Sequence, residues 1–314
     1  MRRYILKRIL ALLPVMLVVA SVVFGIQHMT PGNPAEIILG EEATQEQVRA
    51  LEEKMGLDRP FIVQLGRWFG HLLQGDLGES IYYQKPVLSI VLGHALPTIQ
   101  LTLLALTVTI ALGLLMGVFA AAFHNTLLDN ALMFIASIQL SLPISWIGLV
   151  LMLAFSLHYR IFPVSGYVAF SEGPLQSILY LTLPALALGA GAAARLARMT
   201  RSSMLEILRS DYIMTARAKG LGEMPVLFKH ALKNAAVPIL TVIGLSMANM
   251  LGGAVVSEQI FGIPGLGKLL IFSVFNRDYP VVQGVVLYIA FIYILINLTI
   301  DILYAWIDSR ITYG

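Results

Sequence analysis

The feature that most constrains this chain is a series of long stretches without Asp, Glu, Lys or Arg. A helix needs about 20 apolar residues to cross the hydrocarbon core of a membrane, because its backbone polar groups must be bonded internally. Six such stretches predict six transmembrane helices, over about 9–29, 96–122, 130–157, 175–197, 234–257 and 281–303. The chain is therefore predicted to be an all-α membrane protein whose residues 1–314 form one transmembrane domain.

Composition supports lipid as part of the solvent. Hydrophobic residues make up 58% of the chain and charged residues 12%, whereas soluble proteins have about 45–50% and about 25%. So few charges cannot cover the surface of a soluble fold of this length. The chain has no cysteine, which excludes a disulfide framework and a thiol nucleophile, and its net charge of +3 is too small to argue for nucleic acid as a partner.

The distribution of Lys and Arg predicts the orientation of the spans, because basic residues stay on the cytoplasmic side. Arg2, Arg3, Lys7 and Arg8 precede the first span, which is longer than a secretory signal and is expected to be a retained anchor. Eight basic residues against three acidic ones lie between the fourth and fifth spans. Both termini of this multi-pass membrane protein are therefore predicted to lie in the cytoplasm. Binding of anionic lipid is an alternative reason for the basic segment.

Residues 30–94 are expected to form an external helical insert, with nine acidic and five basic residues. Thr44 and Gln47 have the spacing of a capping box at the start of a helix. A second amphipathic stripe begins at Phe61 and continues to Leu73. This insert is expected to lie on the membrane or on neighbouring helices, and a docking platform for an external partner is the alternative.

Residues 205–233 form the segment that says most about function. Ser210 or Asp211 can cap a short helix that ends at Gly220, and Pro225 suits the first turn of a following helix. A connector between two spans needs only a few residues. A helix, a glycine bend and a second helix therefore predict a cytoplasmic surface for another subunit.

The sequence contains no complete catalytic or metal-binding motif, so the chain is predicted not to be an enzyme and to have no catalytic or metal site. Residues 262–268 match part of a phosphate-binding loop, but Leu269 replaces the hydroxyl residue that would hold Mg²⁺, and no strand is expected before them. The six histidines are scattered, and no Ser nucleophile motif is present.

The predicted spans carry almost no ionisable groups. Asp301, near the end of the sixth span, is the only candidate expected inside a membrane helix. A secondary transporter would need a charged coupling group in mid-span, so that class is disfavoured, and a membrane scaffold stays as another alternative. Uncharged polar residues could line a translocation pathway: Gln139, Ser141, Ser145, Ser246 and Asn249. Gly113 and Gly117 predict close packing of helices.

Short motifs along the whole chain carry a resemblance to a known family. They are PGNPA at 31–35, GLDRP at 56–60, GDLG at 75–78, TARAKG at 215–220, KHALKNA at 229–235, PGLG at 264–267 and RDYP at 277–280. In these motifs the chain resembles the first permease subunit of bacterial dipeptide, oligopeptide and nickel ABC importers. Met214 and Lys233 replace the Glu and Pro of the general importer motif, and Asn33 and Ser309 also depart from the usual residues.

The resemblance implies a type I ABC importer permease fold with a cytoplasmic coupling helix. It implies ATPase-coupling roles for Asp211, Tyr212, Thr215, Ala216, Arg217, Ala218, Lys219, Gly220 and His230. The implied partners are a second homologous permease in a heterodimer, two cytoplasmic ATPases that bind ATP and Mg²⁺, and an external solute-binding protein. This chain would bind no cofactor itself. The implied solutes are di- and oligopeptides, with nickel chelates, glutathione or another small solute as alternatives.

Overall fold

The structure is a computed structural model that describes residues 14–25, 39, 44–55 and 58–307. Within them the chain is helical, apart from one isolated bridge between Glu79 and Pro86. In chain order the helices are Pro14–Gly25, α3 (Gln45–Met55), α4 (Phe61–Leu73), α5 (Val87–Ala122), α6 (Leu127–Ser141), α7 (Ile144–Leu151), η1 (Met152–His158), α8 (Pro174–Leu208), α9 (Asp211–Ala218), α10 (Glu223–Pro225), η2 (Val226–Ala231), α11 (Leu232–Asn234), α12 (Ala236–Phe261), α13 (Leu266–Phe275) and α14 (Tyr279–Ile307). Here η marks a π-helix.

Four helices in the described part of the chain are long and apolar enough to cross a membrane: α5, α8, α12 and α14. The bent pair formed by residues 127–141 and 144–158 gives a fifth candidate if it is counted as one span. The first predicted span, 9–29, is described only over Pro14–Gly25, where it is an apolar helix. Over the residues that the structure describes, the fold is therefore an all-helical membrane fold with four to five candidate spans.

Several helices run past the spans predicted for them. α5 begins at Val87 rather than near 96, α8 continues to Leu208 and α12 continues to Phe261. Arg and Glu are good helix formers, so charged residues end an apolar stretch without ending a helix. The charge-free stretches indicate where lipid is expected, and the helices themselves are longer.

The predicted span 130–157 is not one helix. It consists of α6 and of α7 with η1, and the two parts are bent by 110° at the break. Leu142 and Pro143 both have extended backbone conformations at that point. Proline disfavours the helical conformation in the residue before it and lacks the N–H that would continue the helix, which explains the break.

Contacts between Cα atoms divide the chain into two units, Met1–Ala95 with Lys268–Ile294 and Leu96–Gly267 with Leu295–Gly314. In the first unit, the ring of Phe24 lies 5.6 Å from that of Phe61 and 5.3 Å from that of Trp68. The capping box before α3 is confirmed, because the Thr44 N–H donates to Gln47 Oε1 and the Gln47 N–H donates to Thr44 Oγ1.

A buried carboxylate organises the loop before α5 in the same unit. Asp278 accepts hydrogen bonds from the Ser80 hydroxyl at 2.5 Å and from the N–H groups of Ile81 and Tyr82 at 3.2 and 3.3 Å. The Ser80 oxygen in turn accepts from the Tyr83 N–H. Burial raises the pKa of the Tyr83 phenol, and the nearby Tyr82 and Asp278 add to that shift.

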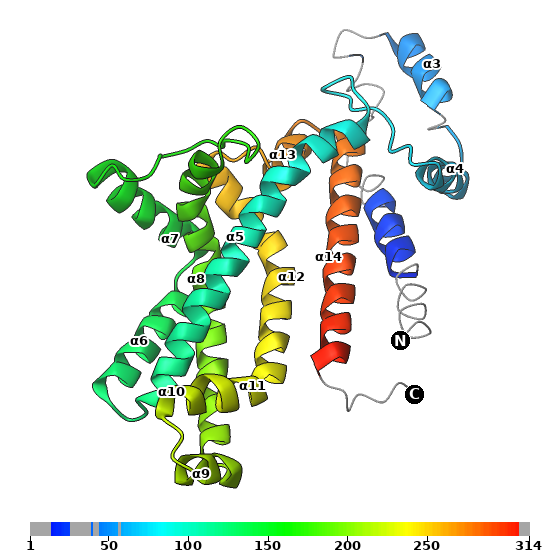
Figure 1. The fold of residues 1–314 in the computed structure, drawn as a ribbon. Helices are drawn as coiled ribbons and strands as arrows, with labels where there is room; N and C mark the ends of the chain where they lie inside the picture. The colour runs from blue at the N-terminus through cyan, green and yellow to red at the C-terminus, as the bar shows by residue number, and fades with distance from the viewer. Residues whose placement is uncertain (1–13, 26–38, 40–43, 56–57, 308–314) are drawn as a thin grey trace. The chain divides into compact units, whose positions relative to one another are not determined.

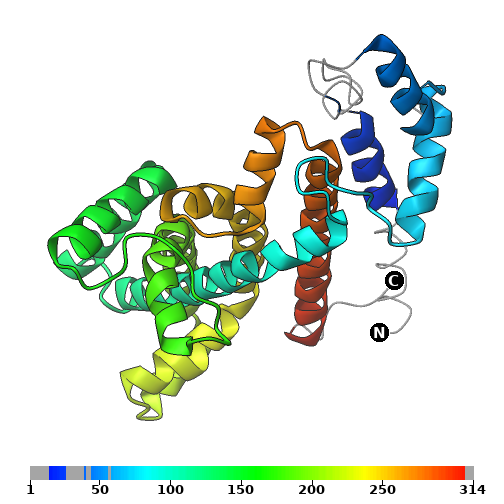
Figure 2. The ribbon, with the colours of Figure 1, turned by 90° about the horizontal axis from the view of Figure 1, so that it is seen from above.

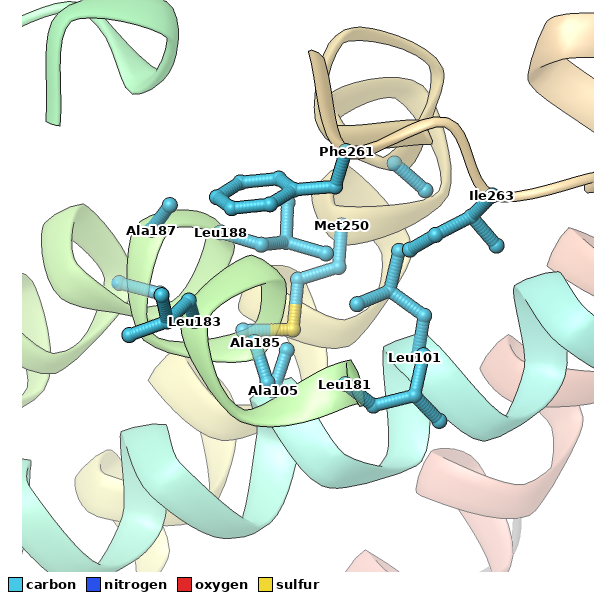
Figure 3. Packing of buried hydrophobic residues seen from close by; sticks show 12 residues of the cluster. Leu101, Ala105, Leu181, Leu183, Ala185, Ala187, Leu188, Met250, Phe261 and Ile263 are labelled. Carbon is cyan, nitrogen blue, oxygen red and sulfur yellow. The ribbon is translucent and has the colours of Figure 1, made fainter. Parts of the chain in front are cut away.

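The first of two hydrophobic cores in the second unit lies where α5, α7, α8 and α12 meet (Figures 1 and 2). Figure 3 shows how Met250 and Phe261 of α12 pack against Leu183 and Leu188 of α8. Most buried residues of α8 are small, so neighbouring helices can approach it closely. The core residues are Leu101, Ala105, Leu181, Leu183, Ala185, Ala187, Leu188, Ala192, Met250, Ala254, Phe261 and Ile263.

A second core in the same unit joins α5 and α8 to the short helices after α8. The predicted close packing at Gly113 and Gly117 is confirmed, because a Cβ atom there would lie 2.7 Å from the Leu196 Cβ and 2.5 Å from the Thr200 Cβ. The buried residues are Val118, Ala121, Leu196, Met204, Ile213, Val226, Leu227, Ala231, Ala235 and Ile239.

Candidate functional site

Residues 209–235, which we call the elbow, contain α9, α10, η2 and α11. Ser210 occupies the position before α9, but its hydroxyl donates to the Ile207 carbonyl and does not cap the helix. Pro225 lies in α10, after the N-cap residue Gly222, as the sequence predicts for the second helix. The predicted arrangement of helix, bend and helix is therefore present.

Gly220 makes the bend after α9. Its φ is +83°, in the left-handed region that side chains disfavour. Its N–H donates to the Arg217 carbonyl at 2.9 Å, and the Leu221 N–H donates to the Ala216 carbonyl at 3.3 Å, which satisfies the end of the helix. No atom lies within 4 Å of a Cβ built at Gly220, so the backbone conformation alone requires glycine there.

One side of the elbow is fixed to the rest of the second unit. Ile213 of α9 and Val226 and Ala231 of η2 are fully buried in the core that they share with α5, α8 and α12. A force applied to the elbow is therefore transmitted to three long helices through packed side chains.

Four large apolar side chains of the elbow are exposed. The exposed fractions are 45% for Tyr212, 59% for Met214, 60% for Met224 and 40% for Phe228. We call these four residues the apolar face of the elbow. Exposed apolar groups that cluster on a surface mark sites of interaction, and methionine adapts its shape to a partner.

The remaining residues predicted to couple to an ATPase lie around this face. Arg217 joins α9 to α10 through a bidentate ion pair with Glu223, with N–O distances of 2.9 and 3.0 Å. The Thr215 hydroxyl donates to the Asp211 carbonyl within α9. His230 and Ala216 are half-buried, whereas Asp211, Ala218 and Lys219 are exposed.

The five polar residues suggested for a pathway do not share one environment. Gln139 and Ser141 lie before the break at Pro143, and Ser145 lies after it. In α12, Ser246 is buried and Asn249 is exposed. The Gln139 Oε1 atom is buried and has no hydrogen-bond partner, so this amide is the most unusual member of the set.

A second buried acidic residue lies just beyond the predicted span 234–257, in addition to the Asp301 named from the sequence. Glu258 lies in the last turn of α12 and is fully buried, and it accepts a hydrogen bond of 2.6 Å from the Thr98 hydroxyl of α5. The charge-free stretch ends at Ser257, so Glu258 is the first residue after the predicted span. The side chain of Asp301 lies outside the described part of the chain.

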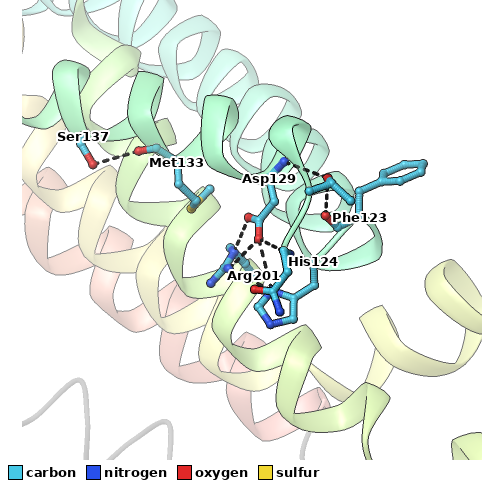
Figure 4. A network of polar contacts seen from close by, with 8 residues as sticks. Phe123, His124, Asp129, Met133, Ser137 and Arg201 are labelled. Carbon is cyan, nitrogen blue, oxygen red and sulfur yellow. Dashed lines mark hydrogen bonds and ion pairs between the residues drawn. The ribbon is translucent and has the colours of Figure 1, made fainter.

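Sequence reasoning also missed a buried ion pair between α6 and α8. Asp129 Oδ1 accepts from Arg201 Nε at 2.6 Å, and Asp129 Oδ2 accepts from Arg201 Nη2 at 2.7 Å (Figure 4). The Asn125 N–H donates to the same carboxylate, and His124 Nδ1 lies 3.2 Å from it. The Asp129 side chain is 2% exposed. In the sequence, Arg201 contributes only to the excess of basic residues that predicts the orientation of the spans.

The partial match to a phosphate-binding loop has a different structural role. A helix, α12, precedes the loop, and Gly262 ends that helix in the left-handed conformation. The Leu266 N–H donates to the Thr98 hydroxyl, so this backbone donor is already used within the protein. A Cβ atom at Gly265 would lie 2.2 Å from Glu258 Oε1. These glycines therefore allow the loop to pack on Glu258.

Comparison with solved structures identifies the class of this fold. An inward-facing structure of the MetNI methionine ABC transporter matches 70% of this chain and 97% of its own chain, with a TM-score of 0.56 and 18% sequence identity. At that identity the likeness shows the fold alone, which is that of an ABC importer permease.

The family follows from the sequence. Residues 110–313 match the family described as the binding-protein-dependent transport system inner membrane component, and residues 1–113 match its N-terminal counterpart. The chain belongs to this family of multi-pass inner-membrane permeases. The permease is a transport subunit and not an enzyme, and its family implies ATPase and binding-protein partners.

Curated relatives match along the whole chain. A putative peptide transport system permease protein of Brucella abortus is 43% identical over 313 residues, which cover 100% of both chains. A dipeptide transport system permease protein of Alkalihalophilus pseudofirmus is 42% identical over 333 residues, again with 100% of both chains covered. A glutathione transport system permease protein of Salmonella paratyphi A is 41% identical over 313 residues, with the same coverage.

Proposed function

We propose that this chain lines half of the pathway of an ATP-driven importer of small peptides and transmits the movement of an ATPase through the elbow. The apolar face of the elbow carries this proposal. Its four side chains are exposed to solvent, although Ile213, Val226 and Ala231 of the same elbow are fully buried. Burying such side chains against a partner is favourable by about 25 cal/mol per Å² of apolar area.

The proposed assembly contains a second homologous permease, two cytoplasmic ATPases that hold ATP and Mg²⁺, and an external solute-binding protein. The chain itself needs no cofactor. Six spans with both termini in the cytoplasm would place the elbow on the ATPase side, in agreement with its five basic residues. Reporter fusions at Gly40, His124, Ser171, Gly222 and Gly314 should read outside, inside, outside, inside and inside. A cytoplasmic signal at Gly40 would contradict this topology.

The names of the relatives support peptides as the solute class. The peptide and dipeptide permeases are 43% and 42% identical to this chain, and the glutathione permease is 41% identical. The two solute classes are separated by uptake of labelled dialanine and labelled glutathione into vesicles that contain the complete transporter. Saturable, ATP-dependent uptake of dialanine is the expected result. If only glutathione is taken up, glutathione replaces peptides as the assigned solute. If only a nickel chelate is taken up, the chelate replaces both peptides and glutathione.

A pair of glycine variants tests the role of the elbow. Gly220→Val places a β-branched side chain at a φ of +83°, at a strain of roughly 1–2 kcal/mol. Gly222→Ala is the matched control, because the φ of Gly222 is −67° and only one atom, of Pro225, lies within 4 Å of a Cβ built there. Uptake and co-purification of the ATPase should fall in Gly220→Val and stay unchanged in Gly222→Ala. Normal uptake and full ATPase recovery with Gly220→Val would refute the coupling role.

A further inference from the structure

α6 is attached to the rest of the protein by very few buried residues. Of its fifteen residues, only Asp129 and Ala136 are buried. Leu132, Met133 and Leu140 are half-buried, and three other apolar side chains are exposed, by 88% for Leu127, 67% for Phe134 and 43% for Ile138. α6 packs along α8, and Asp129 is the one buried charged residue of this helix, where it makes a specific polar contact with α8.

The geometry of the ion pair makes that attachment rigid. Both carboxylate oxygens of Asp129 are bound by the planar guanidinium of Arg201, and the Asn125 N–H binds one of them as well. Two parallel N–H···O bonds fix an angle as well as a distance. Sliding of α6 along α8 would have to break charge-assisted bonds at a carboxylate that is only 2% exposed.

Arg201 lies on the part of α8 that is joined to the elbow. It precedes the end of α8 at Leu208 by seven residues, which is roughly 10 Å along the helix axis. Leu196 and Met204 flank it on α8 and pack in the same core as Ile213 of α9. A displacement of the elbow is thus passed first to the segment of α8 that carries Arg201.

We propose that the Asp129–Arg201 ion pair is a positioning link that makes α6 follow α8 when the elbow moves. This inference rests on the proposed function, because it takes the elbow as the place where the ATPase acts. Without the link, α8 moves while α6 and the bent segment beyond Pro143 lag behind. ATP hydrolysis then continues without productive opening of the pathway.

The first experiment measures the link directly. The chain has no cysteine, so spin labels can be attached at Phe134→Cys on α6 and Glu206→Cys on α8, two exposed positions. The complete transporter is measured by pulsed electron paramagnetic resonance, without nucleotide and with a non-hydrolysable ATP analogue. The parent should give one narrow distance distribution that is the same in both states. Asp129→Asn should give a broader distribution that changes with nucleotide.

The second experiment separates coupling from folding. Asp129→Leu with Arg201→Leu removes both charges, so no unpaired charge is left buried, and such replacements commonly preserve stability. This double variant should assemble and hydrolyse ATP, but its uptake of labelled dialanine should fall roughly tenfold, within the range of typical coupling energies. Arg201→Lys keeps the charge but not the bidentate geometry and should give intermediate uptake.

Ser137→Ala is the matched control on the same helix. The Ser137 hydroxyl donates only to the Met133 carbonyl of α6, so its removal leaves the contact with α8 intact (Figure 4). Uptake and label distances should equal those of the parent.

Two results would overturn the proposal: parent-level uptake by the double leucine variant, or a distance distribution in Asp129→Asn that equals that of the parent in both nucleotide states. Failure of the proposed function is recognised separately. A silent Gly220→Val variant would reject the elbow as the coupling element, whereas the distance between α6 and α8 would still report whether the ion pair joins the two helices.

Discussion

The second unit contains two arginine–carboxylate pairs of the same chemistry in different surroundings. Arg201 binds Asp129 with distances of 2.6 and 2.7 Å, and Arg217 binds Glu223 with distances of 2.9 and 3.0 Å. The Asp129 and Arg201 side chains are 2% and 26% exposed, whereas those of Glu223 and Arg217 are 63% and 41% exposed. Both pairs are bidentate, so the comparison isolates the effect of burial.

Burial decides whether an ion pair can fix the position of a helix or can be replaced without much loss of stability. An exposed pair gains little, because water stabilises the separated charges nearly as well. A buried pair must stay complete, since losing one partner leaves an unpaired charge away from water. The pair between α6 and α8 can therefore define the position of a helix, and the pair in the elbow can only adjust the shape of a surface.

The largest effect is expected from breaking the buried pair on one side. Arg201→Ala leaves the Asp129 carboxylate buried without its main partner, and we expect a loss of about 3–5 kcal/mol in the free energy of unfolding. Thermal unfolding of the purified permease in detergent measures it. Replacement of both residues by leucine is the control and should be close to neutral. A loss below about 1 kcal/mol for Arg201→Ala would mean that the pair is worth no more than an exposed one.

The next largest effect is expected at Gly117, which brings α5 against the turn of α8 that carries Arg201. A Cβ atom at Gly117 would lie 2.5 Å from the Thr200 Cβ and 2.7 Å from the Ala197 carbonyl oxygen. Gly117→Val should therefore force α5 away from α8 and destabilise the fold by about 1–3 kcal/mol. Gly252→Ala in α12 is the control, because no atom lies within 4 Å of a Cβ built there. Equal melting temperatures for the two variants would contradict the close approach.

Much of the fold and of the elbow could be predicted because their signals are local. Charge-free stretches indicate membrane helices whatever their neighbours are. The bend at Gly220 is local too, since glycine at the end of a helix readily adopts the left-handed conformation, and its φ is +83°. The capping box at Thr44 was predicted and confirmed for the same reason.

The buried polar contacts could not be predicted, because they join residues far apart in the chain. Asp129 and Arg201 are separated by 72 positions, and Thr98 and Glu258 by 160. In the sequence Asp129 and Glu258 each follow a charge-free stretch directly and mark only its end. Only the packing of α8 against α6, and of α12 against α5, turns them into partners. The break of the third predicted span was signalled by Pro143, but its angle of 110° depends on the packing around it.

A smaller effect is expected from the bend of the elbow. Gly220→Ala forces a side chain into the left-handed region and should destabilise the purified permease by roughly 1–2 kcal/mol. Gly222→Ala should be neutral or slightly stabilising, because its backbone conformation suits any residue. Both values follow from thermal unfolding of the permease alone. A neutral Gly220→Ala variant would show that the bend relaxes at little cost, and the loss of coupling in Gly220→Val would then have to come from contact with the ATPase.

The smallest effect is expected for the exposed pair, and it decides between two roles of the elbow. Arg217→Ala should change the free energy of unfolding by less than about 1 kcal/mol, because both partners stay hydrated.

If the ATPase docks on the apolar face, recovery of the ATPase should drop only slightly in Arg217→Ala and should hardly change with salt concentration. If the elbow instead attracts anionic lipid through its charges, Arg217→Ala with Lys219→Ala should reduce activity more than Gly220→Val does. Salt should then weaken the interaction strongly, since the Debye length falls from about 10 Å at 0.1 M to about 3 Å at 1 M. Co-purification of the ATPase at both salt concentrations, for the charge variants and for Gly220→Val, distinguishes the two.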